Sequence, residues 1–204
     1  SLTQDDLSRS DMYRANAQRA AQQAAFADYS EYLRSLEMRA VIGDFLPVYI
    51  SRITQLTNKS NQFNLTTRRY TVEEMERIFA DSSYVRLYGK LTDKFGDNGV
   101  VSVVIGKIDG SAVDIELWLM SCRVLKRDME QCMLDQLVAR CKEMGLKTLR
   151  GYYYPTAKNG MVRKLYESFG FEKLSEDSDG SSTWQLDIDS YAPKCNVIEV
   201  VNEV

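Results

Sequence analysis

Three consecutive stretches of β-favouring residues constrain the fold of this chain most. They span about residues 83–92, 99–108 and 112–121. A Gly-Asp-Asn-Gly sequence at 96–99 separates the first two, and Asp109-Gly110 separates the last two. Asn-Gly and Asp-Gly pairs favour the tight turns that join antiparallel strands. The pattern therefore predicts a meander of three antiparallel strands.

Helix and strand patterns alternate on both sides of this meander. Gly145 and Gly170 each follow a helical pattern, and glycine commonly ends helices. Together the patterns predict a mixed α/β sheet of ordinary domain size. The expected elements are a strand at 61–66, a helix at 71–80, a helix at 127–144, a strand at 147–154, a helix at 157–169, and closing strands at 171–174 and 183–188.

The first 57 residues differ in composition from the rest. Ala, Gln and Arg, which are strong helix formers, dominate to about residue 39, and a second helix is expected at 47–57 with Pro47 in its first turn. We therefore predict a helical linker or appendage at 1–57, a domain at 58–190 and a tail at 191–204. The tail contains a β-favouring run at 197–201 without a predicted partner.

Charge and cysteine usage limit the classes of function. The chain has 26 Lys and Arg against 29 Asp and Glu, for a net charge of −3, which disfavours nucleic acid as a partner. Its apolar runs are too short to cross a membrane, and no secretory signal opens the sequence. The four cysteines form no Cys-x-x-Cys pair, which indicates free thiols in a reducing compartment. We expect a cytoplasmic protein with no membrane partner.

The chain contains no histidine. This absence excludes a Ser-His-Asp triad, a Cys-His dyad and any histidine metal site built from its own residues. Proton transfer would have to use carboxylate, Tyr, Lys or water, and we expect no bound metal.

A run at residues 58–70, reading NKSNQFNLTTRRY, is dense in amides, hydroxyls and cations and has no Gly or Pro. Each Asn or Gln side chain carries two donors and two acceptor lone pairs. Such a run either holds a neighbouring backbone in place or binds a polar ligand, and the sequence leaves both open. Asn64, Thr66 and Arg68 are the candidates for ligand contact.

Two resemblances follow from motifs. The stretch 159–171, NGMVRKLYESFGF, resembles the closing motif of the GNAT acyltransferase fold. Four stretches in order resemble the C-terminal half of FkbH-like proteins, and the resemblance covers about residues 3–186. It implies an α/β (α+β) GNAT-like fold with a mixed, mostly antiparallel sheet. The four stretches are NKSNQFNLTTRRY (58–70), FGDNG (95–99), LMSCRVL (119–125) and YPTAKN (154–159).

The FkbH-like resemblance implies a function. In that family a haloacid-dehalogenase-type phosphatase domain of subfamily IIIC precedes the GNAT-like half. Its members are associated with transfer of a glyceryl unit from 1,3-bisphosphoglycerate to an acyl carrier protein, in pathways to methoxymalonyl units and polyketides. The implied partners are an acyl carrier protein and the N-terminal phosphatase domain, whose Asp-x-Asp-x-Thr loop is not in these residues. The implied co-substrate is the phosphopantetheine arm of the carrier, or coenzyme A, with no cofactor bound permanently.

Cys122 is the candidate nucleophile. It is expected at the end of strand 112–121, where the central strands of a GNAT sheet separate and the thioester enters. A thiol there could accept an acyl group and pass it to the arm, and Arg123, Lys126 and the following helix N-terminus would favour its thiolate. The alternative is a buried structural cysteine, because free Cys is among the most buried residue types.

Residues 123–128 occupy the place of the pyrophosphate loop of the GNAT fold, where backbone amides at a helix N-terminus bind phosphates. Lys126 and Asp128 stand at its two glycine positions. Their side chains would hinder close approach of the phosphates to the backbone, which disfavours binding of coenzyme A. Arg123, Lys126 or Arg127 could instead bind the single phosphodiester of a phosphopantetheine arm. The alternative is that this basic turn is only exposed to solvent and binds no ligand.

Two further residues follow from the closing motif. Tyr166 matches the tyrosine that protonates the leaving thiolate in many GNAT enzymes, or packs on the sheet. Asn159 caps its helix or binds the pantetheine amides.

Three functions remain open at this point: acyl transfer to a carrier protein, N-acetyl transfer from acetyl-CoA, and a non-catalytic docking module for the carrier. The fold alone does not decide among them.

Overall fold

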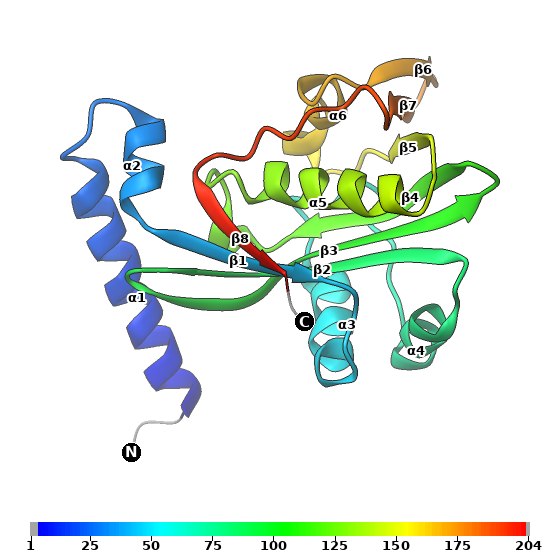
Figure 1. Cartoon of the computed structure of the whole chain (residues 1–204). Coiled ribbons are helices and arrows are strands. Elements are labelled where there is room, and N and C mark those ends of the chain that lie inside the picture. The colour runs from blue at the N-terminus through cyan, green and yellow to red at the C-terminus, as the bar shows by residue number, and fades with distance from the viewer. Residues whose placement is uncertain (1–3, 203–204) are drawn as a thin grey trace.

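The computed structural model describes residues 4–202 and forms one eight-stranded sheet with helices on both faces (Figure 1). The strand order is β6-β7-β5-β4-β3-β2-β1-β8. The strands are β1 (Met38–Gly43), β2 (Tyr84–Asp93), β3 (Gly96–Asp109), β4 (Ala112–Met120), β5 (Thr148–Tyr153), β6 (Glu172–Glu176), β7 (Ser182–Asp187) and β8 (Ile198–Asn202). The α-helices are α1 (Gln4–Gln23), α2 (Tyr29–Ser35), α3 (Ile50–Lys59), α4 (Val72–Ala80), α5 (Met129–Glu143) and α6 (Leu165–Ser168), and the 3-10 helices are η1 (Pro47–Tyr49), η2 (Cys122–Val124) and η3 (Gly160–Val162).

The predicted meander is confirmed as β2, β3 and β4, which pair antiparallel in sequence order. The first turn is shorter than expected, because Asp93 pairs directly with Gly96. The Asp93 carboxylate accepts the N–H groups of Phe95 and Gly96, which fixes a turn of two residues. The predicted turn at 96–99 instead lies within β3, where Gly99 has a φ of +67° beside a register shift.

The two faces of the sheet bury separate cores. Helix α5 covers one face with Cys132, Met133 and Leu137, as Figure 1 shows above the sheet. Helices α3 and α4 cover the other face, with Ile53 and Met75 among the buried residues. The sheet is therefore sandwiched, and its two faces present different surroundings to any ligand at its rim.

A β-bulge interrupts β4. Ile105 pairs with Leu117 while Gly106 pairs with Ile115, so Glu116 is an extra residue on β4. A bulge bends its strand and re-aims the side chains beyond it. Accordingly Ile115 packs in the core under α5, whereas Leu117 packs in the core under α3 and α4.

Beyond the bulge, β4 leaves its neighbour. The parallel pairing of β4 with β5 covers only Ala112–Asp114 against Thr148–Arg150. The carboxyl-terminal halves of these two central strands therefore separate, as the GNAT resemblance predicts.

The prediction of an all-helical segment at 1–57 is wrong at β1. Met38, Ala40 and Ile42 are buried while Arg39 is exposed, which is the alternation of a half-buried strand. This strand pairs antiparallel with β2 and parallel with β8. The run is only six residues long and follows strong helix formers, so composition misleads there. The sheet contains strands from all three predicted segments, 1–57, 58–190 and 191–204.

Two other predicted elements differ in the structure. The helix expected at 157–169 is divided into η3 and α6. The strand expected at 61–66 is reduced to one isolated bridge, between Asn64 and Leu119.

The tail run finds its partner in β1, with the pairing running from Met38–Ile198 to Ile42–Asn202. A disulfide joins Cys132 on α5 to Cys195, so the expectation that all four thiols are free is wrong. Buried Asp135 adds to this attachment by accepting the backbone N–H groups of Lys194 and Cys195. The tail is therefore fixed to α5 as well as to the sheet.

The N-terminal helices are also fixed to the domain. Arg19 on α1 donates two hydrogen bonds to the Asp93 carboxylate, at 2.6 and 2.8 Å. Arg127 lies 3.6 Å from the same carboxylate. These side chains are nearly or fully buried, at 6%, 0% and 9% exposure for Arg19, Asp93 and Arg127. The Asp93 carboxylate thus neutralises charge on two buried guanidinium groups, those of Arg19 and Arg127.

This network predicts an acid-sensitive stability. Burial alone would raise the pKa of Asp93, but the hydrogen bonds from Arg19 and Phe95 and the two arginine charges lower it overall. An unfolded Asp titrates near about 3.9. The stabilisation is therefore complete above about pH 4 and is lost as the pH falls through the lower folded pKa. Thermal unfolding between about pH 3 and pH 6 should show a shallower acid limb for Asp93→Asn than for the wild type, and parallel limbs would contradict this.

Candidate functional site

Residues 63–66 fill the gap between β4 and β5, and we call this segment the wedge. The Leu65 N–H donates to the Trp118 carbonyl at 3.1 Å, and the Phe63 carbonyl accepts the Met120 N–H at 3.0 Å. On the other side, the Leu65 carbonyl accepts the N–H of Tyr154 at 2.9 Å. The wedge therefore satisfies the backbone edges that the separation of the two strands would leave open.

Asn159 holds the wedge from behind. Its Nδ2 donates to the carbonyls of Asn64 at 2.9 Å and Tyr154 at 3.0 Å, and its Oδ1 accepts the N–H of Thr156 at 2.8 Å. The side chain makes no capping bond to η3. With 0% exposure, Asn159 uses its amide inside the protein. A contact of Asn159 with the pantetheine amides stays a prediction.

Asn64 and Thr66 are engaged in the same way. Asn64 donates to the Ser60 carbonyl at 3.1 Å and accepts the Thr67 N–H at 2.9 Å. The Thr66 hydroxyl donates to the carbonyl of Glu116, the bulge residue, at 2.7 Å. The polar run thus holds neighbouring backbone in place, which is the first of its two predicted roles. Ligand contact by Asn64 and Thr66 stays a prediction.

Arg68 is the run's candidate that reaches the surface. Its side chain is 49% exposed and its Nη1 lies 3.3 Å from the Glu116 carboxylate. It borders a hollow of about 310 Å³ together with Tyr70, Arg77 and Tyr84. Burial is the main reason that the pKa of Tyr70 is raised to about 12, so its phenol stays protonated at neutral pH. Arg68 can therefore meet a polar ligand on the α4 side of β4.

Cys122 is exposed and is the first residue of η2, separated from the end of β4 by Ser121 alone. The alternative of a buried structural cysteine is therefore wrong. Ser121 fixes the turn, because its N–H donates to the Val101 carbonyl at 2.7 Å and its Oγ accepts the Arg123 N–H at 3.3 Å. The thiol is thus presented at the rim where β4 leaves β5.

A positive patch adjoins this thiol. Arg123 is exposed and borders a hollow of about 640 Å³ between α1 and the start of β3. Burial and the nearby charge of Arg123 lower the pKa of Arg52 on α3. Neither arginine forms an ion pair with a carboxylate of the residues that the structure describes. This arrangement favours an anionic group beside Cys122.

The loop between η2 and α5 keeps a glycine-like backbone. Lys126 has a φ of +65° and Asp128 a φ of +71°, both in the left-handed region that favours glycine. Lys126 is exposed, whereas Arg127 is 7% exposed and donates to the Arg123 carbonyl at 3.0 Å. Of the three cations predicted to meet a phosphate, Arg123 and Lys126 face solvent and Arg127 is turned into the Asp93 network.

Tyr166 is packed inside the domain at 1% exposure. Its ring centroid lies 6.0 Å from that of Trp118 and 4.9 Å from that of Phe171. A Cβ on Gly151 would come within 2.4 Å of the Tyr166 ring, so β5 needs glycine there. Burial raises the pKa of Tyr166. These contacts are those of the predicted packing role, and proton transfer by Tyr166 stays a prediction.

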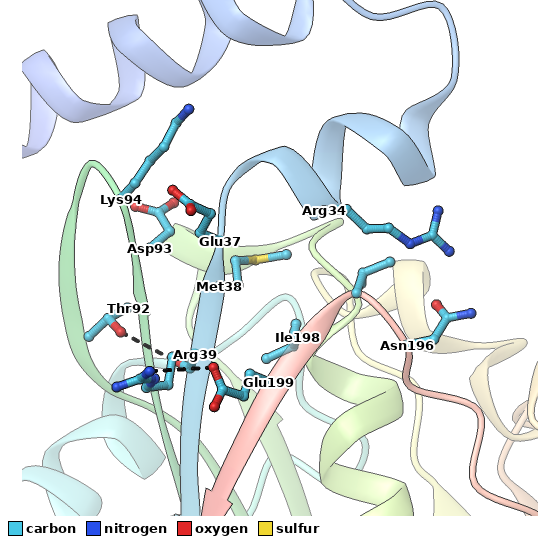
Figure 2. A pocket seen from close by; sticks show the side chains of 11 residues that line it. Arg34, Glu37, Met38, Arg39, Thr92, Asp93, Lys94, Asn196, Ile198 and Glu199 are labelled. Carbon is cyan, nitrogen blue, oxygen red and sulfur yellow. Dashed lines mark hydrogen bonds and ion pairs between the residues drawn. The ribbon is translucent and has the colours of Figure 1, made fainter.

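A separate hollow of about 700 Å³ lies where β1, β2 and β8 meet (Figure 2). Arg39 and Glu199 pair across it at 3.4 Å, with side chains 60% and 66% exposed. None of the predicted site residues borders it. This hollow and the rim of β4 are therefore separate parts of the surface.

Within residues 4–202, no group of three or more His, Cys, Asp or Glu side chains is placed to hold a metal ion. None of the helices in that range is long and apolar enough to cross a membrane.

Nothing in the sequence around Tyr29 predicts that its hydroxyl donates to the Lys126 carbonyl, because the two residues are 97 positions apart. Arg52 was also absent from the predicted site. Its signal is weak, since a single arginine on an amphipathic helix is ordinarily a surface residue.

No protein-family model matches the chain, and no curated protein matches it. Solved structures do match. The ribosomal-protein-S18-alanine N-acetyltransferase of Escherichia coli is 14% identical, over 77% of this chain and 99% of that one, with a TM-score of 0.56. Ard1 of Thermoplasma volcanium is 18% identical, over 72% and 97%, with a TM-score of 0.54.

A third structure, the PaiA N-acetyltransferase of Thermoplasma acidophilum in complex with coenzyme A, is 14% identical, over 72% of this chain and 98% of that one, with a TM-score of 0.55. An acetyltransferase described as of the GNAT family, from Desulfovibrio desulfuricans, matches with a TM-score of 0.54. The chain therefore has the α+β GNAT fold, preceded by N-terminal helices, and this prediction is confirmed.

Proposed function

We propose that the chain is the acyl-transfer half of an FkbH-like enzyme, which moves a glyceryl group to the phosphopantetheine thiol of an acyl carrier protein. Cys122 is the relay. The observation that carries the proposal is an exposed thiol at the end of β4, at the rim where β4 and β5 separate. The four FkbH-like motifs, one of which contains Cys122, support the choice of substrate.

The transfer has two steps. In the first, the Cys122 thiolate attacks the acyl carbonyl of a glyceryl phosphate anhydride derived from 1,3-bisphosphoglycerate, the carbon–oxygen bond to phosphate breaks, and phosphate leaves. In the second, the pantetheine thiol attacks the new thioester and Cys122 leaves with the proton that the pantetheine gives up. Splitting one transfer into two easier steps is the general advantage of a covalent relay.

The surroundings of Cys122 suit both steps. The thiolate is the form of a cysteine that attacks an acyl carbonyl. Arg123 and Arg52 offer positive charge to the leaving phosphate and to the phosphodiester of the arm. Carrier proteins are usually acidic, and the exposed cations Arg68, Arg123 and Lys126 would steer such a partner. The remaining partner in this proposal is the N-terminal phosphatase domain, in a cytoplasmic protein.

The test uses the chain joined to its phosphatase half, with the phosphorylated donor and a carrier protein. We expect the mass of the wild type to increase by one glyceryl group, and Cys122→Ala to lose both this adduct and carrier loading. Cys141→Ala is the matched control, because that thiol is free but fully buried. Normal loading by Cys122→Ala would overturn the proposal.

The second candidate is N-acetyl transfer from acetyl-CoA, which the likeness to a coenzyme A complex favours. Saturable acetyl-CoA binding and acetylation of an amine would support it. If the intact chain bound the carrier but never formed an acyl-enzyme, the third function, a docking module, would be the better one.

A further inference from the structure

The loop before α5 has a left-handed backbone at two positions where the phosphate loop of the GNAT fold carries glycine. Left-handed backbone is unfavourable for a residue with a side chain, because its Cβ comes too close to the following carbonyl oxygen. Lys126 and Asp128 both adopt it within three positions. Such strain persists only where the surrounding structure holds it. The shape is therefore maintained while two side chains occupy positions at which glycine would leave the backbone amides open.

The N-terminal helices close this loop from outside. Tyr29, the first residue of α2, donates a hydrogen bond to the Lys126 carbonyl. Tyr32 and Leu33 of the same helix are buried in the core that α5 shares, and α2 lies on the same side of the sheet as α5 (Figure 1). The buried ion pairs of Asp93 with Arg19 and Arg127 connect α1 to the same loop. A ligand reaching the start of α5 would therefore meet α2.

The charge at the start of α5 also opposes a pyrophosphate. Asp128 occupies the N-cap position without a side-chain capping bond, and Glu130 lies in the first turn. A carboxylate there interacts favourably with the helix dipole and competes with any other anion. Arg127, the cation nearest in sequence, points instead toward Asp93. The backbone amides that bind phosphates in such loops therefore lie beside two carboxyl groups, those of Asp128 and Glu130.

One phosphate can still be accommodated outside this closed loop. Arg123 precedes the loop, is exposed, and has Arg52 nearby as a second cation. A phosphopantetheine arm carries a single phosphodiester, whereas coenzyme A carries a pyrophosphate and a further phosphate on its nucleotide. Exposed Arg123 and half-buried Arg52 therefore match the smaller anion.

From these observations we infer that Lys126 and Asp128, in a loop that Tyr29 holds in place, determine specificity by excluding coenzyme A. This inference rests on the proposed acyl transfer. It limits the thiol that takes part to one whose carrier has a single phosphate and no nucleotide. Glycine at both positions should therefore expose the backbone amides of the loop and allow it to bind the pyrophosphate of coenzyme A.

The test is calorimetric titration of the whole chain with coenzyme A and, separately, with 4′-phosphopantetheine. The wild type should show no saturable coenzyme A binding, whereas Lys126→Gly/Asp128→Gly should bind it at least tenfold more tightly. The double variant should still bind 4′-phosphopantetheine, with an affinity lowered at most by the loss of the Lys126 charge, because Arg123 is unchanged. The double variant should fold, because glycine relieves strain at positive φ and is accepted at an N-cap.

Glu37→Gly is the matched control. Glu37 also has a positive φ, of +54°, but lies outside the loop and is exposed, so its replacement should not create coenzyme A binding. A wild type that binds coenzyme A as tightly as the double-glycine variant would overturn the inference, and so would a folded double variant that gains no binding. Both results are independent of whether Cys122 becomes acylated, so they do not bear on the relay.

Discussion

Replacing Asp93 by alanine is expected to destabilise the protein by about 3–5 kcal/mol, which is typical when one partner of a buried ion pair is removed. The substitution leaves the guanidinium groups of Arg19 and Arg127 buried without their carboxylate. It also removes the acceptor for the N–H groups of Phe95 and Gly96 in the β2–β3 turn. Equilibrium unfolding in urea would show this as a lower midpoint at an unchanged slope.

The control for Asp93 is an exposed ion pair of similar length. Lys147 and Asp189 approach to 3.1 Å, with side chains 59% and 51% exposed. Such surface pairs contribute about 0–1 kcal/mol, so Asp189→Ala should barely shift the midpoint. If the two alanine variants lost equal stability, the Asp93 network would not be what anchors α1 to the sheet.

Replacing Asn159 by alanine should also be costly. The carbonyls of Asn64 and Tyr154 and the N–H of Thr156 would lose their partner in a site with 0% exposure at Asn159. Each buried polar group left unsatisfied costs about 1–3 kcal/mol, so a total loss of roughly 3 kcal/mol or more is expected. Amide hydrogen exchange should accelerate at Leu65 and Tyr154, two of the three N–H groups that join the wedge to β4 and to the end of β5.

Asn61→Ala is the matched control for Asn159, because Asn61 lies in the same polar run but is more exposed. Its Nδ2 makes one long bond, of 3.4 Å, to the Lys59 carbonyl, and its Oδ1 accepts a hydrogen bond from Arg69 in an exposed position. Its replacement should change stability by less than about 1 kcal/mol. Unchanged exchange at Leu65 in Asn159→Ala would show that the wedge does not depend on this amide.

Local patterns were sufficient for the elements whose partners are near in sequence. The meander of β2, β3 and β4 follows from strand propensity and turn residues, and α5 follows from a long helical pattern. The strand β1 was missed because six alternating residues follow a long stretch of helix formers. The parallel pairing of β8 with β1 depends on residues far apart in the chain, for which the local pattern holds no signal.

For the candidate site, too, the sequence predicted local positions but not the contacts between distant residues. The place of Cys122 at the end of β4 agrees with its motif, and its exposure excludes a buried structural cysteine, whereas its role as a nucleophile stays a prediction. The motif could not show that Arg127 turns inward, because its partner Asp93 is on another strand. The motif also could not show that the Asn159 amide donates to the carbonyls of Asn64 and Tyr154, because any residue type can supply a backbone carbonyl.

The β1–β8 pairing has a consequence for how the protein is made. Arg39 and Glu199, which face each other across these strands, are 160 positions apart. At a synthesis rate of about 5–20 residues per second, β1 emerges on the order of ten seconds or more before its outer partner exists. During that interval its free edge can pair with another nascent chain. Expression at lower temperature or with a chaperone should therefore affect the yield of this protein more than its final stability.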